Sequence, residues 1–111
     1  MRIDEQVRGA VTFVRPDGAI TQQDSAVFRT KLLDAAKRSM GRCVVDATAV
    51  PFMDSAALES LLDATDQLGA AGRVLKLCGL HETVRECLEL TGIAGRFDIY
   101  ADGVSAARSF L

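Results

Sequence analysis

The dipeptide Asp54-Ser55 could carry chemistry, because it ends an apolar run and opens a strongly helical segment. Aspartate and serine are both preferred at the N-cap of a helix, where a side-chain oxygen accepts a backbone N–H. One of them is sufficient for that cap, so the other is left without this role. The residues alone favour a cap at Ser55. They leave open a second role, in which the Ser55 hydroxyl is exposed at the tip of the helix as a chemically reactive group.

The other reactive side chains do not combine into a catalytic pattern. His81 is the only histidine and stands at an expected helix start, where a cap or surface role is favoured over that of a general base. Acidic side chains on an exposed helix face exclude little water and form no pocket for acid–base work. The stretch GAAGR lacks the lysine and the glycine spacing of a phosphate loop. We therefore expect no enzyme activity and no cofactor.

The cysteines Cys43, Cys78 and Cys87 are odd in number and show no CxxC spacing. Cys43 and Cys78 lie in apolar, strand-like runs, and Cys87 lies on the apolar face of an expected helix. We expect three buried free thiols, and neither a metal site nor redox catalysis.

The composition is that of a soluble globular protein, with 49% hydrophobic and 25% charged residues, and residues 1–111 are expected to form one domain. The net charge of −2 and the interspersed charges argue against a nucleic-acid partner, which requires a concentrated basic face. The first residues lack the apolar stretch of a signal peptide, and no run approaches the ~20 residues that span a bilayer. We expect a cytoplasmic protein with no membrane partner.

Strands and helices are expected to alternate along the chain. Apolar–polar alternation predicts a half-buried strand at 9–15, and a turn at Gly18 leads into a short antiparallel strand at 19–21. Gly92 followed by Ile93 predicts a Schellman ending. The remaining expected strands are 42–47, 73–80 and 97–100, and the expected helices are 24–38, 54–68, 81–91 and 102–111. This order predicts an α/β fold, a mixed β-sheet of four to five strands with about four helices packed on it.

The helix predicted at 54–68 has two faces, since successive residues are turned by ~100°. Leu58, Leu61, Leu62, Thr65 and Leu68 share the face expected in the core, and Ser55, Glu59, Asp63 and Asp66 share a face expected in water. Phe52 and Met53 directly precede this helix and are expected close to the rim of its tip. Apolar side chains beside an exposed hydroxyl would form a docking patch for a partner.

The stretch VVDATAVPFMDSAALESLL, residues 44–62, resembles the signature of STAS domains, most closely that of bacterial anti-sigma factor antagonists. In that signature a buried strand ends in Asp, and Phe-(Met/Ile)-Asp-Ser opens a helix. Downstream, a strand after a glycine, a helix ending in Leu-x-x-Thr-Gly, a strand led by Phe and a short final helix also fit. The resemblance extends from about residue 8 to residue 111.

The resemblance implies a function without catalysis. In this family the unphosphorylated antagonist binds an anti-sigma factor that is also a serine kinase, and so frees a sigma factor. The resemblance makes Ser55 the phosphoacceptor and Asp54 the better cap, and it implies a metal-dependent serine phosphatase that reverses the modification. The partner-facing residues would be Thr21, Asp24, Phe52, Met53, Asp54, Ala56, Ala57 and Glu59.

Two positions depart from the family's pattern. Ala57 stands where a glycine is usual, and so adds a methyl group where a partner would approach closely. Thr21 stands where an acidic residue is usual, with Asp24 three residues further on. These departures support an alternative function, a non-switching STAS adaptor that docks on a transporter ATPase or a signalling assembly.

Overall fold

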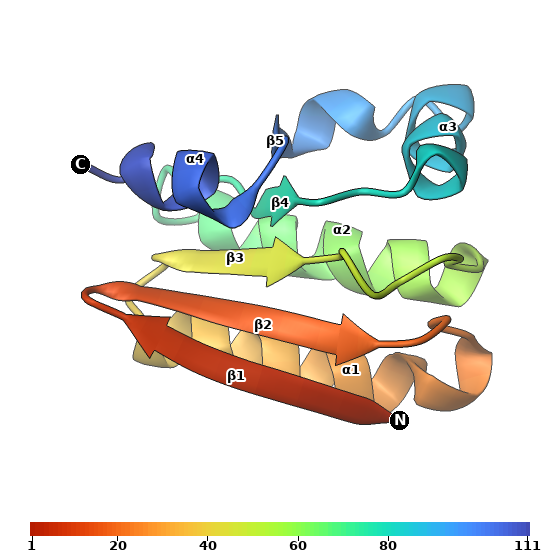
Figure 1. Ribbon diagram of the computed structural model, residues 1–111, viewed down its shortest axis with the longest axis horizontal. Coiled ribbons are helices and arrows are strands. Elements are labelled where there is room, and N and C mark those ends of the chain that lie inside the picture. Colours follow the sequence, from red (N-terminus) through yellow and green to blue (C-terminus); the bar gives the residue numbers. More distant parts are fainter.

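The computed structural model describes residues 1–111, which form one five-stranded sheet flanked by helices (Figure 1). The elements are β1 (Arg2–Arg8), β2 (Val11–Asp17), α1 (Gln22–Arg38), β3 (Cys43–Asp46), α2 (Ser55–Gly69), β4 (Lys76–Cys78), α3 (Glu82–Leu90), a 3₁₀ turn (Ala94–Arg96), β5 (Asp98–Tyr100) and α4 (Gly103–Arg108). The strands lie in the order of the chain. β1 and β2 are antiparallel and all later pairs are parallel, which confirms the predicted α/β fold with a mixed sheet.

The opening hairpin lies one strand earlier than the sequence predicts. β1 pairs with β2 through a turn in which Gly9 has a φ of 61°, a left-handed conformation that suits glycine. The antiparallel strand predicted at 19–21 is wrong, because Ile20 instead forms an isolated parallel bridge with Met53. β1 escaped prediction because it is an edge strand whose residues are nearly all exposed, so charged side chains replace the usual apolar alternation.

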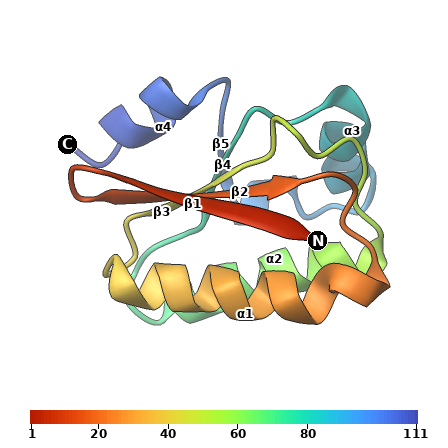
Figure 2. The ribbon, with the colours of Figure 1, turned by 60° about the horizontal axis from the view of Figure 1, so that its bottom comes forward.

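Helices cover both faces of the sheet. Figure 2 shows α1 and α2 side by side beneath the strands and α4 above them. α1 and α2 begin at the same end of the sheet, the end at which α3 lies (Figure 1). This is the carboxyl end of the parallel strands, where open α/β sheets usually carry their functional sites.

The main hydrophobic core fills the space between the sheet and the pair α1 and α2. Phe28, Leu32, Leu61 and Leu77 are among its fully buried side chains. A second, smaller cluster lies under α4 and consists of Val11, Phe13, Val44, Cys78 and Ala106. Both faces of β3 are therefore buried, which explains its uninterrupted apolar run. No helix in the structure combines the length and the apolar character needed to cross a bilayer.

Helix α2 has the two faces that its sequence predicts. Leu58, Leu61, Thr65 and Leu68 are buried and Leu62 is half-buried, whereas Ser55, Glu59 and Asp66 are exposed. The hydroxyl of Thr65 is satisfied in the core, since it accepts from the Leu75 N–H (3.0 Å) and donates to the Arg96 carbonyl (2.9 Å). Asp63 is half-buried because it pairs with Arg29 on α1.

The other predicted elements are present with shifted ends. β4 keeps only three of the eight residues predicted at 73–80. α3 ends in the predicted Schellman motif, in which the Ile93 N–H donates to the Leu88 carbonyl (3.0 Å) and the Gly92 N–H to the Glu89 carbonyl (3.1 Å).

The three cysteines differ in burial. Cys43 and Cys78 are buried, as predicted, but Cys87 is only half-buried. Burial raises the pKa of the Cys43 and Cys78 thiols to about 12. Because the thiolate is the reactive form, both buried cysteines should be nearly inert at neutral pH.

Iodoacetamide at pH 8 is expected to label Cys87 on the order of a hundredfold faster than Cys43 or Cys78, because a higher thiol pKa leaves less thiolate and burial blocks access. Mass spectrometry after brief exposure should find one carbamidomethyl group, on Cys87. The same treatment in guanidinium chloride should label all three cysteines. Equal labelling of Cys43 and Cys87 in the folded protein would contradict the burial described here.

Candidate functional site

Two loops bring the starts of α1 and α2 together at the carboxyl end of the parallel strands. The N–H of Gly18 donates to the Ala49 carbonyl (2.9 Å). Ile20 then forms two backbone hydrogen bonds to the other loop. Its N–H donates to the Phe52 carbonyl (3.0 Å), and its carbonyl accepts from the Asp54 N–H (3.1 Å). The loops that follow β2 and β3 thus act as a short extension of the sheet, and they hold two helix N-termini next to each other.

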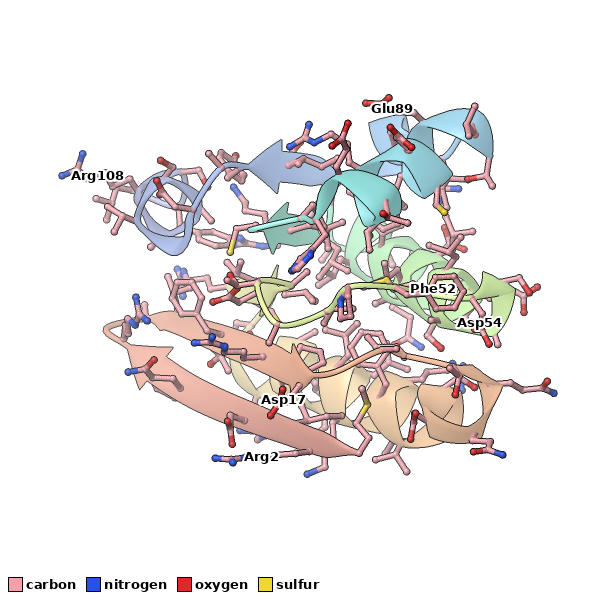
Figure 3. The ribbon with its side chains drawn as sticks, turned by 45° about the vertical axis from the view of Figure 1, so that its right-hand side comes forward. Arg2, Asp17, Phe52, Asp54, Glu89 and Arg108 are labelled. Carbon is pink, nitrogen blue, oxygen red and sulfur yellow. The ribbon has the colours of Figure 1, made fainter.

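Asp54 links these two helix starts. Its Oδ1 accepts from the Ala57 N–H (3.0 Å), which confirms the predicted cap of α2. Its Oδ2 accepts from the N–H of Gln22 (2.7 Å), the first residue of α1. Thr21, the N-cap residue of α1, makes no side-chain cap of its own. One carboxylate therefore serves both helices, and Figure 3 shows Asp54 at the start of α2 with Phe52 at the same end.

Ser55 is the first residue of α2 and is exposed. The cap at Ser55 that the residues alone favoured is wrong, because Asp54 provides the cap and the hydroxyl of Ser55 is not needed for it. An exposed hydroxyl in this position is accessible to a modifying enzyme, and the positive end of the helix dipole favours an added negative charge. The assignment of Ser55 as a phosphoacceptor stays a prediction.

The other residues predicted around Ser55 divide into a surface set and a buried set. Phe52 is 44% exposed, Glu59 is exposed and Ala56 is half-buried. Met53 and Ala57 are only 2% and 0% exposed and belong to the main core, so the expectation that they lie at the partner-facing surface is wrong. Met53 is drawn inward by the bridge between its strand-like loop and Ile20.

Thr21 and Asp24 lie at the start of α1, close to the Asp54 link. The Thr21 hydroxyl donates to Asp24 Oδ2 (3.4 Å), and both residues are half-buried. A carboxylate is therefore present in the first turn of α1 although position 21 is a threonine. The other oxygen of this carboxylate, Asp24 Oδ1, lies 3.8 Å from the N-terminal amine of Met1.

A groove of about 310 Å³ runs between α1 and α2 beside this tip. It is lined by Ser25, Ala26, Arg29, Ala56, Glu59, Ser60 and Asp63. The Nε of Arg29 donates to Asp63 Oδ2 (2.9 Å) across the two helices. Ser25 and Arg29 were not predicted as site residues, because they lie more than 30 positions from the α2 residues that they adjoin. Only the packing of α1 against α2 reveals them.

His81 lies outside this site. It occupies the N-cap position of α3 without capping through its side chain, and its Nε2 lies 2.6 Å from the Thr48 carbonyl oxygen. The imidazole thus ties the loop after β4 to the loop after β3. The structure contains no cluster of three or more histidine, cysteine, aspartate or glutamate side chains arranged for a metal ion.

Comparisons with known proteins agree with this fold. The family model described as the STAS domain matches residues 2–106. A comparison with curated protein sequences gives no match.

Several solved structures share the architecture. An anti-sigma-factor antagonist (STAS) domain protein from Planctomyces limnophilus matches with a TM-score of 0.86 at 19% identity, covering 96% of each chain. SpoIIAA, a Bacillus cell fate determinant solved in its phosphorylated form, matches with a TM-score of 0.71 at 17% identity, covering 97% of this chain and 99% of its own.

A murine anion transporter, solute carrier 26 family member A9, matches with a TM-score of 0.76 at 18% identity. This match covers 95% of the present chain but 18% of the transporter. Identities this low show a shared fold, and the partners of each protein remain its own. Because the family model matches nearly the whole sequence, the chain belongs to the STAS domain family.

Proposed function

We propose that this STAS domain is an anti-sigma factor antagonist whose binding is controlled by phosphorylation of Ser55. The observation that carries the proposal is the division of roles at the start of α2, where Asp54 makes the cap and Ser55 is exposed. The signature-like residues 44–62 and the fold shared with SpoIIAA, which has been solved unphosphorylated and phosphorylated, support it.

In this proposal the unphosphorylated chain binds an anti-sigma factor that is also a serine kinase, and a sigma factor is released. The kinase phosphorylates Ser55 and the complex separates. A metal-dependent serine phosphatase restores the hydroxyl. The chain acts in the cytoplasm. It contributes the phosphoacceptor Ser55 and a surface that binds the anti-sigma factor, while the catalytic groups belong to its partners.

The partner surface in this proposal is a small apolar and acidic patch around Ser55. Phe52 supplies an exposed aromatic ring, the kind of side chain that anchors many protein interfaces. Asp24 and Glu59 supply carboxylates on α1 and α2. Ala56 and the Asp54 link complete the tip, since Asp54 fixes the relative position of both helices.

The two departures from the family's pattern are compatible with this function. Ala57 is fully buried, so the methyl group that replaces a glycine hydrogen packs into the core and adds no bulk to the surface. Thr21 is hydrogen-bonded to Asp24, which keeps a carboxylate at the start of α1. Neither substitution obstructs the approach of a kinase to Ser55.

A second function is supported by the likeness to the transporter-borne STAS domain. In that case the chain would be an adaptor that docks on a transporter ATPase or a signalling assembly, without a phosphorylation cycle. The shared fold at 95% coverage of this chain is the observation that favours it. The two functions differ in whether charge at position 55 matters.

Affinity capture from the lysate of the native host distinguishes them. The baits are the unmodified chain, Ser55→Ala and Ser55→Asp, with Ser105→Asp as a matched control. Ser105 is likewise an exposed serine in the first turn of a helix that is capped by an aspartate, Asp102. Antagonist function predicts a kinase-fold anti-sigma factor that is retained by Ser55→Ala and Ser105→Asp and lost from Ser55→Asp. Retention of one common partner by all four baits would establish the adaptor.

A further inference from the structure

Basic side chains collect at the end of the sheet opposite Ser55. The β1–β2 turn, the link from α1 to β3, the link from α2 to β4 and the last part of α4 meet there (Figure 1). These segments are residues 6–13, 35–45, 67–77 and 103–111, and none contains Asp or Glu. The side-chain carboxylates that adjoin them include Glu5 and Asp34, which pair with Arg38, and Asp98, which lines a pocket with Arg73 and Lys76. Their basic residues are Arg8, Lys37, Arg38, Arg42, Arg73, Lys76 and Arg108. We refer to this region as the basic end.

Three of these arginines line a single groove of about 250 Å³. Arg8 comes from β1, Arg42 directly precedes β3 and Arg108 comes from α4, and no aspartate or glutamate lines the groove. None of the three takes part in an ion pair, in contrast to Arg2, Arg29, Arg38 and Arg96. The groove is therefore lined by three guanidinium groups and by no acidic side chain, so it carries a net positive charge even with the terminal carboxylate of Leu111, which also lines it.

The guanidinium of Arg8 and the backbone of Arg42 are held in place. The guanidinium of Arg8 lies over the ring of Phe13, 4.6 Å from its centroid, and donates to Gln6 Oε1 (3.0 Å). Arg42 is half-buried, and its carbonyl accepts from the Thr12 N–H (2.8 Å). A guanidinium that is already oriented loses less conformational entropy when it binds an anion.

The walls between the arginines are apolar and include Val11, Ala107 and Phe110. A guanidinium presents paired N–H donors that match the two oxygens of a carboxylate. An apolar wall between such donors favours a ligand that alternates carboxylates with an apolar side chain. The groove is too small and too concave to fit the broad surface of a bilayer. A nucleic acid is also disfavoured as a ligand, because it requires a longer basic track than three arginines provide.

We propose that this groove binds an acidic segment of a partner protein, whose carboxylates pair with Arg8, Arg42 and Arg108 while an apolar side chain packs on Val11 and Phe110. The site lies at the opposite end of the domain from Ser55 and does not depend on the switch proposed there. A STAS domain with two separate binding ends can hold one partner while it exchanges the other.

Fluorescence anisotropy with a short labelled peptide of alternating glutamate and leucine tests this site. The variant Arg42→Gln/Arg108→Gln keeps the stacking of Arg8 on Phe13, and circular dichroism verifies its fold. The control Arg15→Gln/Arg85→Gln removes the same charge from exposed arginines outside the groove. We expect the groove variant to weaken binding by about tenfold or more and the control by less than about threefold.

Three further comparisons sharpen the result. Binding should weaken as salt is raised, should be lost with a peptide that carries glutamine in place of glutamate, and should persist in Ser55→Asp. Equal losses in the groove variant and the control, or no saturable binding by the unmodified chain, would overturn the proposal. Stronger binding to phosphatidylserine vesicles or to an oligothymidine than to the peptide would overturn it as well, by assigning the groove to another class of partner.

Discussion

A phosphoryl group on Ser55 is expected to weaken the complex with the anti-sigma factor by tens-fold to thousands-fold. Phosphoserine carries nearly two negative charges at neutral pH. In the complex these charges would lie in an interface close to Glu59, one helical turn further along α2. An unpaired charge in an interface costs ~2–5 kcal/mol, and ~1.4 kcal/mol corresponds to a tenfold change in affinity. Titration calorimetry with the phosphorylated and unphosphorylated chain measures the effect.

The same modification should leave the fold intact. At the N-terminus of α2 the helix dipole favours a negative charge by roughly 0.3–1 kcal/mol, and the exposed position needs no repacking. We expect the melting temperatures of the two forms to agree within a few degrees. Ser55→Ala, treated with the same kinase, controls for phosphorylation elsewhere. Equal affinities of both forms, or a large drop in melting temperature on phosphorylation, would contradict a switch that acts through surface charge.

Asp54→Ala is expected to lower the free energy of unfolding by about 2–3 kcal/mol. The substitution leaves the N–H groups of Ala57 and Gln22 without their shared acceptor, and so removes a cap from two helices at once. A loss of this size corresponds to a fall in melting temperature of roughly 10 °C or more for a domain of this length. Urea denaturation followed by circular dichroism provides the measurement.

Two matched variants separate the two bonds of Asp54. Asp54→Asn keeps one carbonyl oxygen, so it can preserve one of the two bonds and should have an intermediate effect. Asp102→Ala removes an aspartate that caps α4 through one bond, to the Ser105 N–H (2.8 Å), and should destabilise the protein less than Asp54→Ala does. If Asp54→Ala and Asp102→Ala cost the same, the bond to Gln22 contributes nothing to stability.

Elements with strong local signals were predicted correctly. Leu58, Leu61 and Leu68 of α2 repeat at helical spacing and are buried. The Schellman motif at Gly92 follows from a glycine and an apolar residue in adjacent positions. Such features depend on contacts within one or two helical turns, so they can be predicted from a short stretch of sequence. For the cap of α2 the residues alone favoured Ser55, and the family resemblance favoured Asp54, which makes the cap.

The errors fall where burial depends on distant parts of the chain. β1 is charged and exposed, and it is a strand because its backbone pairs with β2 at the edge of the sheet. Met53 was expected near the surface, but the loop that carries it runs beside Ile20 and turns its side chain into the core. Ala57 was expected to meet a partner and instead meets the core. In each case a neighbour far away in sequence decided the outcome.

The α/β class, most of the helices and strands and the exposed face of α2 follow from the amino-acid sequence, because they depend on periodicity and on contacts between close neighbours in the chain. The second cap that Asp54 makes, on α1, depends on the folded chain, because it joins residues 32 positions apart. The basic end also forms only on folding, because charges that are interspersed along the chain become neighbours when three connecting segments and the last part of α4 meet at one end of the sheet. Local sequence patterns do not show which distant segments come together, because that depends on how the whole core packs.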